Sequence, residues 1–215
     1  MNEDLTIINE NIKKERILNF YKKNKKKIFG IILAIIIFIF SIIFYNYLVE
    51  RKITNLSKDY IYASIQAQEG KKIEATNNFK KIIYSNEPTY SSLALFFLIE
   101  KELIVDLNEI LNLYDHVINN NKFDTEMKNL LIYKKALVIF ERSTEISMVE
   151  ILKPIINSDS VLKSQAQLLL GDFFVYKKNY LKAKDLYLRI FNESNQDNYK
   201  ILAKDKLENI SNEIN

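Results

Sequence analysis

Residues 164–193, SQAQLLLGDFFVYKKNYLKAKDLYLRIFNE, predict two helices joined by a turn. The positions that decide this are two small residues, Gly171 and Ala183, and three aromatic ones, Phe174, Tyr180 and Tyr187. Gly171 and Ala183 are small enough for two paired helices to cross closely, and aromatic side chains fill the space on either side of the crossing. The stretch therefore predicts a tightly packed helical pair.

Three weaker copies of this unit precede it, at residues 57–84, 89–119 and 128–157. At the position equivalent to Ala183 the copies carry, in order, Ala75, Ile110 and Val149, which gives spacings of 35, 39 and 34 residues. The last unit resembles a tetratricopeptide repeat, whose period is about 34 residues. We therefore expect an α-solenoid of about four such helix pairs, although an irregular helical bundle remains the alternative.

The composition supports an all-α class. The chain contains three Gly, two Pro and many Lys, Glu, Asn, Ile and Leu residues, which favours long helices and short connections. Because it has no Cys, disulfides, thiolate zinc sites and thiol catalysis are excluded.

Prolines and polar residues indicate where the helices begin and end. Pro88 is expected in the first turn of a helix, with Asn86 as its cap, whereas Pro154 should kink or end the helix that contains it. Residues 196–210 predict a C-terminal capping helix. Its expected apolar side consists of Tyr199, Leu202, Leu207 and Ile210.

Before the repeats, residues 28–49 form the uncharged stretch IFGIILAIIIFIFSIIFYNYLV. As a helix these 22 residues would be about 33 Å long, enough to cross a hydrocarbon core of about 30 Å. A buried core helix would have more of a polar face, and a cleaved signal peptide would be shorter and end in small residues rather than Tyr45 and Tyr47. The stretch therefore predicts one retained transmembrane helix.

The distribution of charge predicts the topology. The first 27 residues hold eight of the 31 basic and four of the 27 acidic residues, so the rest of the chain carries 23 of each. The basic excess predicts that the N-terminus lies in the cytosol, where we expect residues 22–27 to touch anionic lipid headgroups. The neutral remainder argues against nucleic-acid binding. The expected parts are a cytosolic tail (1–27), a transmembrane helix (28–49), a linker (50–56) and an exported repeat domain (57–215).

No constellation of residues points to catalysis. His116 is the only histidine, and the chain contains no P-loop, dinucleotide fingerprint, nucleophile elbow or zinc-protease motif. We therefore expect no enzyme activity, no metal, no cofactor and no small-molecule substrate.

A helical solenoid binds its partners through a concave surface lined by the first helix of each pair. The mixture of apolar and weakly charged residues expected there suits extended or partly unfolded polypeptide. From the repeat register, the candidates are Tyr60, Ser64, Leu95, Ile99, Lys134, Val138, Leu168 and Asp172.

The order of elements resembles the YfgM-like family of bacterial inner-membrane proteins. The resemblance rests on residues 19–24 (NFYKKN), 89–94 (TYSSLA) and 170–172 (LGD), and it extends from Ile17 to Leu207. It implies an ancillary subunit associated with the Sec translocon and with a membrane-anchored periplasmic prolyl isomerase chaperone. Such a subunit would help to hand emerging polypeptides to periplasmic chaperones. An envelope scaffold for cell division or outer-membrane assembly is the alternative.

Overall fold

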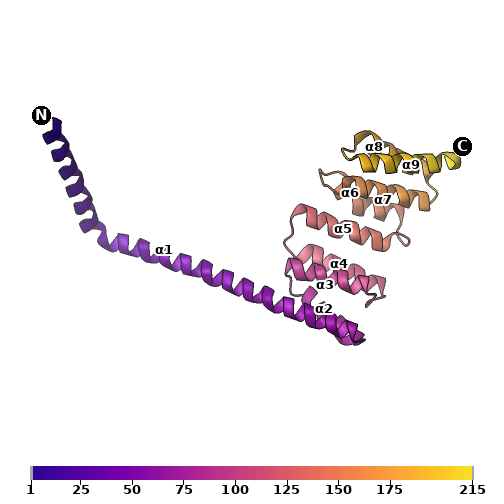
Figure 1. Ribbon diagram of the computed structural model, residues 1–215, viewed down its shortest axis with the longest axis horizontal. Helices are drawn as coiled ribbons and strands as arrows, with labels where there is room; N and C mark the ends of the chain where they lie inside the picture. The colour runs from indigo at the N-terminus through magenta and orange to yellow at the C-terminus, as the bar shows by residue number, and fades with distance from the viewer. Residues whose placement is uncertain (1, 215) are drawn as a thin grey trace. The chain divides into compact units, whose positions relative to one another are not determined.

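The computed structural model describes residues 2–214, without the side chains of residues 2–13, 15, 17, 18, 28, 212 and 214. The described residues form helices and no strands, which confirms the all-α class. Part of the predicted tail (1–27) thus lies outside the described side chains. The helices, labelled in Figure 1, are α1 (Asn2–Gln68), α2 (Lys72–Ile83), α3 (Pro88–Glu100), α4 (Leu107–Asn120), α5 (Thr125–Ile139), α6 (Glu145–Ile156), α7 (Lys163–Tyr176), α8 (Tyr180–Glu193) and α9 (Asp197–Ile214).

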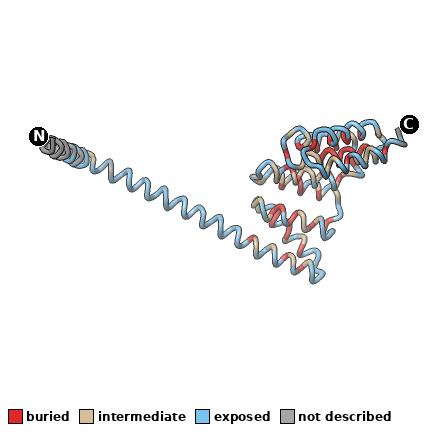
Figure 2. The backbone as a smooth tube through the Cα atoms, turned by 45° about the horizontal axis from the view of Figure 1, so that its top comes forward, coloured by how far each residue is buried: buried red, intermediate tan, exposed pale blue. Residues whose placement is uncertain are grey.

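The chain divides into two structural units, Met1–Asn55 and Leu56–Asn215. Within the described part of the first unit, α1 is continuous, so residues 50–55 of the expected linker are helical. All side chains in residues 29–50 are exposed, as the pale blue tube in Figure 2 shows. The described residues contain one helix that is long and apolar enough to cross a membrane, and this stretch belongs to it.

In the second unit, helices that follow one another in the chain pack against one another. Contacts join each helix from α2 to α8 to the next one, and α7 also touches α9. Figure 1 shows the same succession of helices along this unit. The helices are therefore arranged in layers along the chain rather than around one common centre.

Two core clusters form inside these layers. The first runs from Leu56 to Leu131 and includes Phe79, while the second runs from Ala136 to Ile210 and includes Phe173. Both clusters take residues from α5, whose first half contributes to one and whose second half contributes to the other. Helix α5 is therefore the element that the two cores share.

The close helix crossing predicted at Gly171 is present between α7 and α8. A Cβ atom placed on Gly171 would lie 2.9 Å from Cζ of Tyr187, well inside normal contact distance. Ala183 is fully buried, as predicted, and the hydroxyl of Tyr187 donates a hydrogen bond of 2.6 Å to Oδ1 of Asp172. Only glycine fits at position 171 without moving the Tyr187 ring.

The predicted inward-facing position is wrong in two helices. Val149 is 37% exposed while its neighbour Met148 is fully buried, and Leu202 is 41% exposed while Ala203 is fully buried. Consecutive residues on a helix point about 100° apart. In both helices two apolar residues are adjacent in sequence. The sequence pattern therefore does not show which of the two faces the core, because packing against the neighbouring helices determines it.

The helix ends follow the prolines, with one correction. Pro88 is the first residue of α3, as predicted, but the cap is Glu87, whose Oε2 accepts a 2.7 Å hydrogen bond from the backbone N–H of Tyr90. Asn86 instead adopts a left-handed backbone conformation with φ of 53°. Pro154 lies inside α6, and the helix ends two residues later at Ile156.

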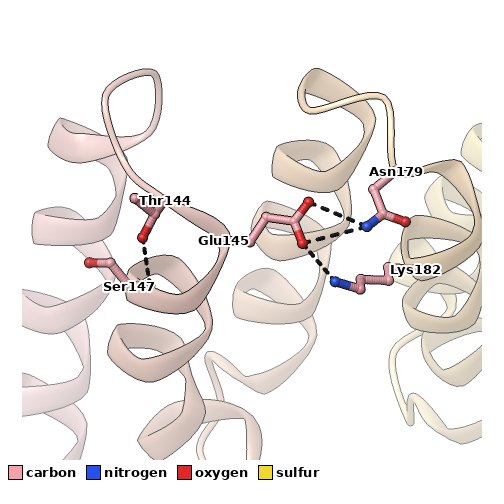
Figure 3. A network of polar contacts seen from close by, with 5 residues as sticks. All are labelled: Thr144, Glu145, Ser147, Asn179 and Lys182. Carbon is pink, nitrogen blue, oxygen red and sulfur yellow. Dashed lines mark hydrogen bonds and ion pairs between the residues drawn. The ribbon is translucent and has the colours of Figure 1, made fainter.

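A polar network joins the start of α6 to the start of α8 (Figure 3). Thr144 caps α6, with Oγ1 accepting a 3.2 Å hydrogen bond from the backbone N–H of Ser147. The Glu145 carboxylate pairs with Nζ of Lys182 at 2.6 Å and accepts hydrogen bonds from Nδ2 of Asn179 at 3.3 and 3.5 Å. The hydrogen bond from Lys182, followed by that from Asn179, lowers the pKa of Glu145 below its ordinary value.

A Glu145→Gln variant tests this network. A lowered native-state pKa contributes stability above the unfolded-state value of about 4.3, and that stability is lost as the pH falls through the lowered native pKa. At neutral pH we expect the variant to lose up to about 1 kcal/mol of unfolding free energy, since exposed ion pairs contribute little more. The difference should disappear in acid, as measured by urea unfolding of the full chain in detergent at several pH values. A difference independent of pH would contradict this account.

Candidate protein-binding groove

The eight residues predicted to bind a partner lie on four helices, two on each of α1, α3, α5 and α7. Val138 and Asp172 line one common groove, and the other six do not line it.

Leu95 and Leu168 do not belong to an accessible surface. Leu95 is fully buried in the first core cluster, and Leu168 is buried in the second. Helix α7 shows the physical reason, because all residues from Ala166 to Gly171 are buried and the helix contacts α6, α8 and α9. A helix covered on several sides has no single inward face, so its repeat register cannot separate groove from core.

Tyr60, near the start of the second unit, packs against aromatic residues of the first core cluster and does not line the groove. The ring of Tyr60 contacts Phe79 edge-on, with 5.4 Å between ring centroids, and also meets Tyr90 and Phe97. Burial of its phenol, and to a lesser extent the charge of Glu100, raises the pKa of Tyr60.

The remaining three predicted residues also lie outside the groove. Ser64 Oγ donates a 2.8 Å hydrogen bond to the backbone oxygen of Tyr60. Ile99 is half-buried against the first core cluster, and Lys134 is exposed on α5.

The groove that contains Val138 and Asp172 has a volume of about 560 Å³. It lies between the start of α4, the end of α5 and the middle of α7, next to the loop that precedes α4. Its lining residues are Val105, Leu107, Ile110, Leu137, Val138, Phe140, Glu141, Arg142, Leu169 and Asp172.

Apolar residues dominate the groove, with a few charges among them. Ile110 comes from the first core cluster and Leu169 from the second, so the groove lies where the two cores meet. Val105 is 87% exposed and Leu137 is 40% exposed, which leaves two large apolar side chains open to solvent. An apolar surface beside charged groups is typical of sites that bind polypeptide.

Asp172 is held in place by two partners within the fold. Its Oδ1 accepts the hydrogen bond from Tyr187 and also lies 2.6 Å from Nζ of Lys206 on α9. Burial of the phenol, followed by the bond to Asp172, strongly raises the pKa of Tyr187. Helix α9 thus fixes one charged side chain of the groove.

Sequence reasoning missed a second groove of about 400 Å³, on the start of α3 and the α4–α5 connection. Its apolar lining includes Leu93, Phe96, Phe123 and Met127. The consecutive apolar residues of α3 could have indicated it, because Leu93 and Phe96 lie three residues apart on one helix face.

Within the part of the chain that the structure describes, no group of three or more His, Asp or Glu residues is placed to hold a metal ion. Comparisons of this chain with protein-family models, with curated proteins and with solved structures found no match.

Proposed function

We propose that this chain is a non-catalytic adaptor, anchored in a membrane by α1, whose helical domain binds other proteins. The observation that carries the proposal is the groove between α4, α5 and α7, in which Val105 and Leu137 expose apolar side chains beside Glu141, Arg142 and Asp172. Burying such side chains against a partner stabilises a complex by about 25 cal/mol per Å² of apolar surface removed from water.

The domain is proposed to be a tetratricopeptide-like solenoid. Consecutive helices pack in order, which a solenoid requires. The close crossing of α7 and α8 at Gly171 agrees with the small-residue position of that repeat. Helix α9 then serves as the capping helix, with Ala203 and Ile210 in the second core cluster.

The proposed location is the bacterial inner membrane, with the N-terminus in the cytosol and the helical domain in the periplasm. The eight basic residues before the apolar stretch support this orientation. The resemblance to the YfgM-like family supports the compartment and the partners, which are the Sec translocon and a membrane-anchored periplasmic prolyl isomerase chaperone.

Site-specific photocrosslinking in living cells tests this function. A photoreactive amino acid at Leu137 is expected to capture translocon or chaperone subunits, identified by mass spectrometry. The matched control is Ile73 on α2, which is 76% exposed but lies outside the groove. Capture of cell-division or outer-membrane assembly proteins from Leu137 would instead favour an envelope scaffold. Equal capture from both positions would refute the groove as the binding site.

A further inference from the structure

A polar pocket lies at the other end of α7 from the turn into α8. Its volume is about 360 Å³, and it is formed by two connections, α6–α7 and α8–α9, together with the first turn of α7. Its lining residues are Asp159, Ser160, Val161, Lys163, Ser164, Gln167, Glu193, Ser194, Asn195 and Gln196. None of them lines the groove between α4, α5 and α7.

Gln167 is the unusual residue of this pocket. The residue is only 5% exposed, and among the described residues no group donates a hydrogen bond to its amide or accepts one from it. The amide is not among the fully buried side-chain groups that lack a partner, so it is open to the pocket and to the water there. Because Gln167 lines the pocket, a ligand there could supply both missing hydrogen bonds.

The first turn of α7 adds backbone donors, but the N–H of Lys163 already donates to the carbonyl oxygen of Ser160 at 3.1 Å, which leaves those of Ser164 and Gln165. The residue that caps this helix, Leu162, makes no side-chain hydrogen bond to the backbone of the first turn. The early N–H groups of a helix have no partner within the helix itself. The pocket therefore combines backbone donors with an amide that can both donate and accept.

The rest of the lining favours a neutral ligand over an ion. Ser164 Oγ lies 3.1 Å from Ser194 Oγ, which ties the start of α7 to the α8–α9 connection. Lys163 lines the pocket together with Asp159 and Glu193, so both signs of charge are present, with a formal excess of one negative charge. Hydroxyl and amide groups, which both donate and accept, make up most of the remaining polar lining.

From these observations we propose that the pocket binds the main chain of an extended polypeptide, with the Gln167 amide paired to one residue of it. In an extended chain the N–H and C=O of one residue point to the same side, as in an antiparallel ladder. A carboxamide can accept from that N–H and donate to that C=O at once. The inference rests on the proposed function as a polypeptide-binding adaptor and adds a second contact point that recognises backbone rather than side chains.

The test measures binding of a fluorescent peptide to the full chain in detergent by fluorescence anisotropy. The probe is a short blocked peptide of alternating alanine and serine, and its comparison peptide carries N-methyl groups that remove the backbone donors. Gln167→Leu keeps the side-chain size but removes the amide, and Gln165→Leu is the matched control on the same helix. We expect Gln167→Leu to weaken binding about tenfold, as the loss of two hydrogen bonds predicts.

The expected pattern also includes loss of binding by the N-methylated peptide, unchanged binding by Gln165→Leu, and a melting temperature of Gln167→Leu equal to or above that of the parent. Replacing an amide that has no partner within the protein removes no hydrogen bond of the fold, whereas removing a structural hydrogen bond destabilises it. Equal binding of both peptides, or unchanged binding by Gln167→Leu, would overturn the inference. The comparison of the two peptides on the unmodified chain tests backbone recognition even if Gln167→Leu does not fold.

A Leu137→Glu variant separates this inference from the proposed function, because Leu137 lines the groove and not the polar pocket. If Leu137→Glu abolishes peptide binding and Gln167→Leu does not, the groove remains the proposed binding site and the inference about the polar pocket is overturned. The reverse result would support the pocket and count against the groove.

Discussion

Replacing Phe79 with alanine is expected to lower the free energy of unfolding of the helical domain by about 3–5 kcal/mol. Phe79 is fully buried, and its ring stacks on Phe97 with centroids 4.5 Å apart and meets the edge of Tyr60. The substitution removes these ring contacts and leaves a cavity that the surrounding helices fill only in part. Urea unfolding of the full chain in detergent, followed by circular dichroism, measures the loss.

The matched control is Phe191→Ala on α8, where the ring is 42% exposed and the expected loss is below about 1 kcal/mol. Hydrogen exchange adds a spatial readout, because Phe79 belongs to the first core cluster alone. Amides in α2 and α3 should lose protection before those in α7 and α8. Equal losses for the two variants would contradict the assignment of Phe79 to the core.

Replacing Gly171 with valine is expected to destabilise the domain by about 3 kcal/mol, at the upper end of the range for overpacked cores. The Cβ atom alone would lie 2.9 Å from Cζ and 3.0 Å from Cδ1 of Tyr187. The Tyr187 ring is 1% exposed and its hydroxyl is bonded to Asp172, so the ring cannot turn away without losing that bond. The gain in helix propensity over glycine, less than about 1 kcal/mol, does not offset the overlap.

A second substitution tests this cause. Tyr187→Leu removes the ring atoms that the new side chain meets, so the double variant should be more stable than the sum of the single effects predicts. The expected coupling is about 1–3 kcal/mol, as for residues in direct contact. Additive effects would mean that Gly171 is required for another reason.

Sequence reasoning predicted the order of helices and the long apolar helix near the N-terminus because both depend on patterns within one segment. The pair formed by α7 and α8 follows from small and aromatic residues at fixed spacing, and the Pro88 helix start follows from a rigid ring. Which residue of an apolar pair faces inward depends on the packing of three helices together. Met148 is therefore buried in place of Val149, and Ala203 in place of Leu202.

The residues that line the groove were predicted only in part for a related reason. Val138 and Asp172 line the groove, whereas Leu95 and Leu168 are buried in the cores, although Leu168 and Asp172 lie on the same helix. The polar pocket had no periodic signal, since residues 159–164 and 193–196 approach one another only after α7 and α8 have packed. Connections between helices have no helical periodicity, so a sequence pattern does not predict which of them lie next to one another.

The succession of contacts between neighbouring helices also bears on how the chain reaches its native state. Each helix packs mainly against the next one in the chain, so few stabilising contacts join segments that are distant in sequence. Folds with mainly local contacts reach the native state quickly. The first core cluster ends at Leu131 and contains no residue from α6 to α9. The domain can therefore acquire structure progressively during synthesis, before its C-terminal helices have emerged.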